Sequence, residues 1–218
     1  VKILIIISGV FTIASNIFNI NITALAAGLG VGGIAIAMAA KESLENLFGS
    51  FVIFLDRPFV VGDIVTVSNV TGIIESVGFR STRIRTFDKS LVTVPNKKMV
   101  DAEVDNLGMR SSRRTKFNVG VTYETSKAQI KKITRDIKKT IDQHPKTDKN
   151  LGRVKFLNFG SSSLDIMVMY YVKGTDWDTY LDTTEEINFK IMDIVKKHKS
   201  DFAFPSTTVY LNKWKMLR

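Results

Sequence analysis

The sequence predicts a membrane α-helical segment followed by soluble α+β domains, and three observations support this fold class. Residues 24–40 include eleven Ala or Gly residues, and the other six residues are apolar. Residues 1–40 carry one charged side chain, Lys2, whereas the rest of the chain holds 30 Lys and Arg residues against 21 acidic residues. After residue 57 the hydrophobic pattern changes from helical spacing to short alternating runs, which is typical of strands.

The first 40 residues predict two apolar helices joined by a turn. Val1–Phe18 would span about 27 Å, close to the thickness of a bilayer core. Asn16, Asn19 and Asn21 mark the turn, and Ala24–Ala40 forms the second helix, so we expect a helical hairpin in lipid. The alternative is a buried hairpin of a soluble protein. Against it, each Gly costs about 1 kcal/mol relative to Ala in a soluble helix, whereas small residues favour close helix packing in lipid. Because the first residue is Val, we expect further residues before it.

A polar break interrupts the apolar run at Lys41-Glu42-Ser43 and predicts a bend. Beyond it, Ser43–Leu55 has apolar residues at helical spacing, so we expect this part to lie along the membrane surface. Arg57-Pro58 should end the helix, because Pro lacks an N–H donor and disfavours helix at the preceding residue.

The middle of the chain predicts a small, bent β-domain of about 50 residues. Gly, Asn and Asp residues separate its four short strands, which are expected at Ile64–Val67, Gly72–Val77, Thr82–Thr86 and Leu91–Val94. Residues 108–113 (GMRSSR) are interpreted as a linker.

The last part predicts a ferredoxin-like domain, because its elements follow the order β-α-β-β-α-β. The helices are expected at Ser126–Gln143 and Asp178–Lys199, each with one apolar face. The strands are expected at Thr115–Val121, Val154–Phe159, Leu164–Val172 and Thr207–Leu211. The predicted domain boundaries are therefore 1–57, 58–108 and 109–218.

No residue pattern supports catalysis, so we expect neither an enzyme nor a cofactor. The chain has no Cys, and its two His residues, His144 and His198, have no neighbours at metal-ligand spacing. Asp176 and Asp178 are interpreted as dipole partners at a helix start. The glycines at 28, 30 and 33 match a dinucleotide fingerprint, but that motif requires a preceding strand.

Basic residues are clustered in the soluble part, at 110–116, 127–139, 196–199 and 213–218. An excess of Lys and Arg after an apolar segment indicates that the soluble domains are cytoplasmic. Nucleic-acid surfaces usually interleave aromatic residues with such charges, and the helix at 126–143 has none, so no nucleic-acid partner is expected. In an oligomer, the repeated charge would raise the local concentration of anions.

Three stretches together resemble the small-conductance mechanosensitive channel (MscS) family. They are the Ala/Gly-rich helix, the segment DRPFVVGDIV at 56–65, and VPNKK at 94–98. The resemblance covers residues 1 to about 211. It implies a homoheptamer with a pore helix at Ala24–Ala40, a Sm-like β-domain and a C-terminal α/β domain that form a cytoplasmic cage.

The resemblance also implies a seal of two rings of large apolar residues, which fall on Ile34 and Met38. These residues are four apart, so they share a face of the helix, and narrow apolar rings can block ions by dewetting. The small residues on the flanks, where neighbouring helices would pack, are Gly28, Gly32, Gly33, Ala35, Ala37 and Ala39. The family often has Gly at the helix bend; here that position is Glu42, so the bend is expected at Glu42 or near Gly49.

The predicted function is a weakly selective ion channel that opens with membrane tension and releases ions and small solutes during hypo-osmotic shock. The excess of basic over acidic residues predicts a mild anion preference. The expected location is a bacterial inner membrane, with an organellar inner membrane as the alternative. The expected partners are membrane lipids and further copies of the chain. The alternative function is a membrane-anchored module whose Sm-like domain binds nucleic acid, but a simple anchor gives no reason for a helix so rich in Gly and Ala.

Overall fold

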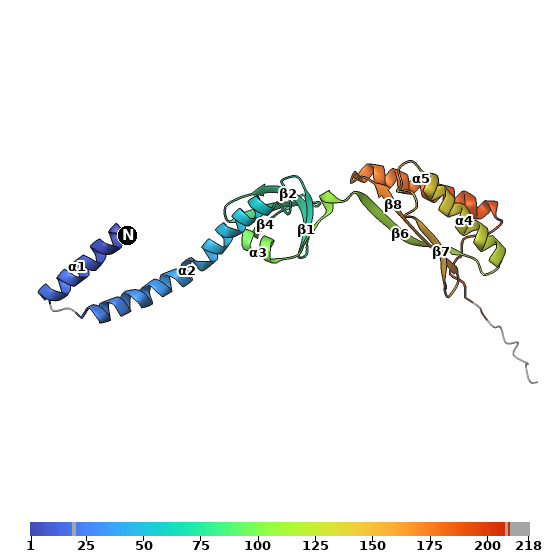
Figure 1. Ribbon diagram of the computed structural model, residues 1–218. Coiled ribbons are helices and arrows are strands. Elements are labelled where there is room, and N and C mark those ends of the chain that lie inside the picture. Colours follow the sequence, from blue (N-terminus) through green and yellow to red (C-terminus); the bar gives the residue numbers. More distant parts are fainter. Residues whose placement is uncertain (19–20, 208, 210–218) are drawn as a thin grey trace, which may run out of the picture. The chain divides into compact units, whose positions relative to one another are not determined.

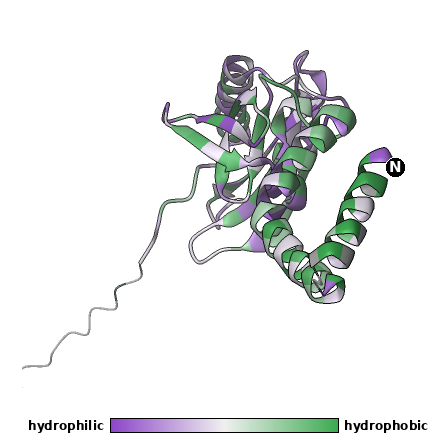
Figure 2. Ribbon diagram, turned by 90° about the vertical axis from the view of Figure 1, so that its left-hand side faces the viewer, coloured by the Kyte–Doolittle hydropathy of each residue, from purple (hydrophilic) through white to green (hydrophobic). Residues whose placement is uncertain are grey.

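The computed structural model describes residues 1–18, 21–207 and 209. The chain divides into two compact units, Val1–Leu107 and Gly108–Arg218. The first unit begins with two helices, α1 (Lys2–Phe18) and α2 (Ile22–Asp56) (Figure 1). Most of α1 and the first turns of α2 are hydrophobic (Figure 2).

Within the described residues, α2 is the one helix long and apolar enough to cross a membrane. The apolar part of α1, Ile5–Ser15, is shorter. Asn21 caps α2, because its side chain accepts a hydrogen bond from the Ala24 N–H at 3.1 Å. Asn19 lies outside the described residues, so the lipid hairpin stays a prediction.

Helix α2 continues through the polar residues at 41–43, where the sequence predicted a bend. It ends where predicted, at Asp56. Arg57 adopts the left-handed conformation at the C-cap, with φ 47°, and donates its N–H to the Ile53 carbonyl. Pro58 follows, so the chain turns away from the helix axis.

The β-domain after α2 is a five-stranded antiparallel sheet. Its elements are β1 (Ile64–Val67), β2 (Val70–Val77), β3 (Ser81–Thr86), β4 (Leu91–Pro95), α3 (Asn96–Asp101) and β5 (Val104–Asn106). The strand order is β4-β3-β2-β1-β5. The four predicted strands are confirmed, whereas the short elements α3 and β5 were not predicted. Ile53 of α2 packs into the core of this domain together with Phe59, Ile74 and Met99.

The second unit is a three-stranded antiparallel sheet, with α4 and α5 on one face (Figure 1). After a short 3-10 turn, η1 (Leu107–Met109), its elements are β6 (Ser112–Val121), α4 (Lys127–Gln143), β7 (Arg153–Phe159), β8 (Leu164–Lys173) and α5 (Trp177–Lys197). The strand order is β6-β8-β7. Alternate residues of β8 are buried, as expected for a sheet covered on one side.

Two sequence predictions for this unit require correction. Thr207 and Val209 are not in a strand. The other three residues of the predicted closing strand lie outside the described part. The chain instead meets the sheet earlier, because Phe202 forms an isolated bridge with Val121 and Ala203 donates its N–H to the Gly120 carbonyl. The predicted linker is also shorter, since β6 begins at Ser112, which pairs with Lys173.

Candidate pore helix

The first half of α2 is exposed along its whole length. Every residue from 22 to 39 is exposed, and none of them is charged. Ile34 and Met38 are 63% and 73% exposed and lie one helical turn apart on the same face. The structure therefore places both predicted seal residues where nothing in the single chain covers them.

No contact within the single chain requires small side chains at the predicted packing residues of this half. A Cβ atom added at Gly28, Gly32 or Gly33 would meet no heavy atom within 4 Å apart from the nearby backbone of its own helix. Ala35, Ala37 and Ala39 are likewise exposed. Their role between neighbouring helices stays a prediction.

The second half of α2 is fixed to the β-domain through Asn46, Gly49 and Ile53, which are buried. A Cβ atom at Gly49 would lie 2.9 Å from the Asn96 carbonyl carbon and 3.0 Å from the Lys97 nitrogen. Gly49 thus allows α3 to approach the helix backbone closely. The predicted bend at Glu42 or Gly49 stays a prediction, and the structure adds this packing role for Gly49.

Asn46 and Lys97 connect α2 to the start of α3. The Asn46 side chain donates to the Glu42 carbonyl at 2.9 Å and accepts the Lys97 N–H at 3.0 Å. Lys97 Nζ also lies 2.6 Å from a carboxylate oxygen of Glu45. This connection was not predicted from the sequence. The one sequence feature that could have indicated it is Asn46, an amide next to the apolar residues that recur at helical spacing in this segment.

Asn96, the second residue of the Pro-Asn pair, organises the β2–β3 turn. Its side chain is fully buried, accepts a hydrogen bond from the Thr82 hydroxyl at 2.9 Å and donates to the Gly78 carbonyl at 2.7 Å. Its backbone N–H donates to the Arg80 carbonyl. One amide side chain therefore satisfies the buried Thr82 hydroxyl of β3 and also holds the exposed turn residue Gly78.

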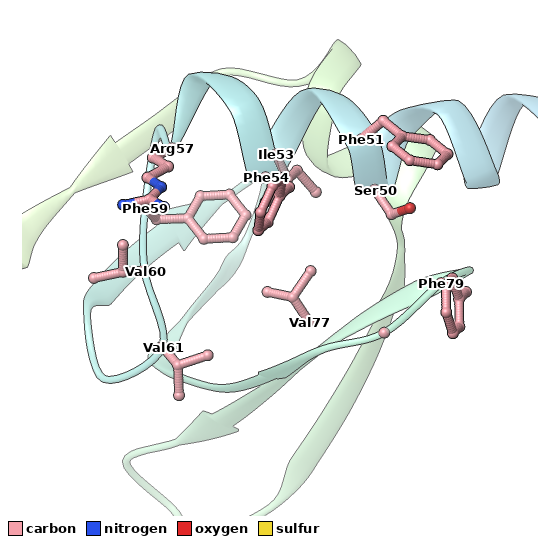
Figure 3. Close-up of a pocket in the computed structure, with 11 residues that line it drawn as sticks. Ser50, Phe51, Ile53, Phe54, Arg57, Phe59, Val60, Val61, Val77 and Phe79 are labelled. Atoms are coloured by element: carbon pink, nitrogen blue, oxygen red, sulfur yellow. The ribbon is translucent and has the colours of Figure 1, made fainter.

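An apolar pocket of about 400 Å³ lies at the foot of α2. Figure 3 shows it between the last turns of α2, the loop at Phe59–Val61, and the end of β2. Its polar side chains among the described lining residues are Ser50, which donates to the Leu47 carbonyl, and Arg57. This pocket has no acid–base pair for catalysis.

The two His residues have structural partners. His144 Nε2 lies 3.0 Å from Glu186, and His198 Nε2 lies 2.8 Å from Asp136, so both pairs join α4 to α5. These hydrogen bonds hold the pKa of each carboxylate below its ordinary value. In the described part of the chain, no three His, Cys, Asp or Glu residues are grouped to hold a metal ion. Asp176 caps α5, accepting the Thr179 N–H at 2.7 Å.

Comparison with known families agrees with this architecture in both units. Residues 42–109 match the family described as "Mechanosensitive ion channel, beta-domain". Residues 115–202 match "Mechanosensitive ion channel MscS, C-terminal". The chain belongs to the MscS family. The matched MscS regions begin at Glu42, so they include the second half of α2 and exclude the exposed first half.

Individual MscS proteins extend the similarity to nearly the whole chain. An uncharacterised MscS family protein of Aquifex aeolicus is 44% identical over 90% of this chain and 54% of its own length. The small-conductance mechanosensitive channel MscMJ of Methanocaldococcus jannaschii is 42% identical over 98% of this chain and 60% of its own length. The closed-state crystal structure of Helicobacter pylori MscS has a TM-score of 0.76 and 27% identity, covering 97% of this chain and 81% of that chain. The chain thus spans little more than half the length of these two curated relatives.

Proposed function

We propose that this chain is the pore-forming part of a mechanosensitive ion channel, in which α2 of several identical copies lines a central pore. The main support for the proposal is the difference between the two halves of α2. Residues 22–39 are exposed and uncharged, whereas Asn46, Gly49 and Ile53 are buried against the β-domain. Such a large exposed apolar surface is stable where lipid or further copies of the chain cover it.

The assembly is a ring of copies surrounded by membrane lipids, with seven copies by resemblance to the MscS family. Gly28, Gly32 and Gly33, with the three alanines at 35, 37 and 39, form the contacts between neighbouring α2 helices. Because a Cβ at these glycines would meet nothing in its own chain apart from the nearby backbone of its own helix, close approach of another copy supplies the reason for their small size. The bend lies at Glu42 or near Gly49, and the three domains are 1–57, 58–108 and 109–218.

Gating follows from the apolar seal and from membrane tension. Rings of Ile34 and Met38 exclude water from a narrow pore and thereby block ions. Tension favours the state that occupies more membrane area. The open state has the larger area, so tension shifts the equilibrium towards it, as a ligand would if it bound that state more tightly. Sliding of neighbouring helices past small residues widens the pore and lets it fill with water.

The proposed role is the release of ions and small solutes when a cell swells in dilute medium. The channel lies in a bacterial inner membrane with its soluble domains in the cytoplasm, because the basic residues follow the apolar segment. It is weakly selective, and its net charge of +10 per chain favours anions.

Single-channel recording under pipette suction tests this proposal on the full-length protein. Patches that contain the protein should show stepwise currents above a threshold tension, and patches without it should not. Patches that stay silent up to rupture would contradict the proposal. Affinity for RNA that falls steeply with salt, in the absence of such currents, would favour the membrane-anchored nucleic-acid module instead.

A further inference from the structure

A groove of about 520 Å³ lies between α4 and the strand β7, and it is here termed the α4–β7 groove. Phe156 and Phe159 line it, with their ring centroids 5.0 Å apart in an edge-to-face contact, and Phe159 is 74% exposed. The charged residues among the described lining are three lysines, Lys127, Lys131 and Lys155, and none is acidic. The groove therefore combines an apolar wall with positive charge.

Helix α5 has an exposed face of the opposite charge, here termed the outer face of α5. Leu181, Glu185, Phe189 and Met192 follow each other at intervals of four, four and three residues, so they share one side of the helix. All four are exposed, and Phe189 is 58% exposed. The other charged residues within about 60° of Glu185 around the helix axis are Asp178, Asp182 and Lys196. The outer face thus carries three acids and one base beside its apolar side chains.

The groove and the outer face lie at opposite edges of the second unit. The strand order β6-β8-β7 places β6 and β7 at the two edges of the sheet. Helix α4 lines the groove with β7, whereas Asn188, Ile191 and Met192 of α5 lie beside residues 117–120 of β6. A single chain therefore cannot place its own α5 in its own groove.

The charges of both surfaces have no ion-pair partner within the described residues. Elsewhere the same two helices pair their charges within the chain. Lys138 pairs with Asp142 inside α4, and Glu186 of α5 pairs with His144. Exposed aromatic and Met side chains bordered by charged residues are typical of surfaces that bind another protein.

We infer that the outer face of α5 in one copy docks in the α4–β7 groove of a neighbouring copy. The inference rests on the proposed function, in which identical copies form a ring, and adds a specific contact between their soluble domains. A second copy is the occupant that the charges favour, because the chain itself carries an acidic helix face that complements the basic groove. Since the two surfaces lie at opposite edges, the contact is head-to-tail, and such contacts form rings when the rotation closes.

Cross-linking between copies tests this contact. The chain has no Cys, so one cysteine can be placed on each surface, with Thr134→Cys in the groove and Met192→Cys on the outer face. The full-length protein with no other cysteine, treated in membranes with a short bis-maleimide, should give a ladder of multimers on a denaturing gel. Either single variant has one reactive site per chain and cannot exceed a dimer. A double variant that also stops at the dimer would overturn the inference.

Charge reversal in the double-cysteine protein tests the complementarity. Lys127→Glu with Lys131→Glu should lower the yield of multimers several-fold, because acids would then face acids. Asp182→Lys with Glu185→Lys should lower it similarly, and the four substitutions together should restore most of the ladder. A fold that is merely disturbed gives no reason for such recovery, and its absence would overturn the inference.

Lys132→Glu is the matched control for the charge reversals. Lys132 follows Lys131 along α4, points about 100° away from it around the axis and does not line the groove. The yield of multimers should therefore stay at the level of the double-cysteine protein. A loss as large as that from Lys127→Glu with Lys131→Glu would overturn the inference, because the yield would then follow overall charge.

The outcomes separate this inference from the proposed function. Tension-activated currents without a ladder would overturn the contact and leave the channel proposal intact. A ladder without currents in the wild type would support the contact and remove the proposed function instead. Cross-linking of the Thr134→Cys variant to a different protein, with no ladder in the double variant, would assign the groove to another partner and also overturn the inference.

Discussion

Ile34 and Met38 present apolar side chains at exposed positions one helical turn apart. If they form the seal, a hydroxyl in place of either side chain should let water into the closed pore, because dewetting requires an apolar wall. We expect Ile34→Ser and Met38→Ser to open at lower tension than the wild type, or to leak at rest and slow growth. Suction thresholds in patches measure the effect.

Ile36 provides the matched control for these two variants. It is 73% exposed on the same helix, and it points about 200° away from Ile34. Ile36→Ser should leave the threshold closer to that of the wild type. A larger shift from Ile36→Ser than from Ile34→Ser would move the seal to the opposite face.

Asn96 is the residue on which the junction of β2, β3 and α3 depends. Removing its side chain in Asn96→Ala leaves the Thr82 hydroxyl and the Gly78 carbonyl without their partner. A buried polar group that loses its hydrogen bond costs about 1–3 kcal/mol. We expect a lower thermal midpoint for the purified protein in detergent.

The exposed turn residue Asn69 serves as the control for Asn96. Surface substitutions away from special contacts usually stay within about 0.5 kcal/mol of the wild type, so Asn69→Ala should unfold at nearly the wild-type temperature. Equal midpoints for Asn96→Ala and Asn69→Ala would show that the buried amide contributes nothing to stability.

At the scale of elements, helices α4 and α5 are joined by two His–carboxylate pairs, each from the C-cap of one helix to the middle of the other. His144, the C-cap of α4, meets Glu186 of α5, and His198, the C-cap of α5, meets Asp136 of α4. The Gln129 side chain also donates to the His198 and Lys199 carbonyls. The two helices therefore have polar links in addition to their shared apolar core.

The Asp136 pair predicts a specific dependence of stability on pH. The hydrogen bond from His198, with a further one from Arg135, lowers the Asp136 pKa below its ordinary value of 3.8. The folded-state pKa is thus below the unfolded-state pKa, so the stabilisation is present above about pH 4 and is lost as the pH falls through the folded-state pKa. Asp136→Asn should lose about 1 kcal/mol at neutral pH.

Thermal unfolding followed by tryptophan fluorescence between pH 7 and about pH 2 measures this effect. The midpoint of the wild type should fall more steeply below about pH 4 than that of Asp136→Asn. The exposed α5 residue Asp193 is the control, and Asp193→Asn should follow the wild-type curve. Parallel curves for wild type and Asp136→Asn would refute the assignment.

At the scale of the whole molecule, the matched family regions cover residues 42–109 and 115–202, and the proposed release of solutes is a property of the assembly. We expect the full-length protein to protect cells that lack their own mechanosensitive channels from sudden dilution. The physical reason is that bilayer tension, which rises as the cell swells, favours the wider state. Survival after the shift from high to low osmolarity measures protection.

The control for survival is a version of the protein that is made and inserted but cannot pass solutes. Its design follows from the recordings, since a substitution that abolishes tension-activated current should also abolish protection. Full protection by such a current-free variant would separate survival from conduction and contradict the osmotic role.

Much of the fold could be predicted because helices and strands leave local patterns. β1 was predicted at Ile64–Val67 and lies there, and α4 begins where Ser126 and Gln129 form a capping box. Such signals depend on residues within one or two turns of each other. The short α3 and β5 have too few residues for a periodic pattern. Thr207 and Val209, the described residues of the predicted closing strand, are not in a strand, and Phe202 pairs with Val121 instead.

The sequence by itself determined the apolar, Gly- and Ala-rich character of α2, the end of that helix before Pro58, and the resemblance to the MscS family, because these reside in residue types and their spacing. Only the tertiary structure decided that Asn46, Gly49 and Lys97 join α2 to α3. The same holds for the ion pair between Glu45 and Lys97, which are 52 residues apart. Contacts between distant residues depend on how the whole chain packs, and no local period records them.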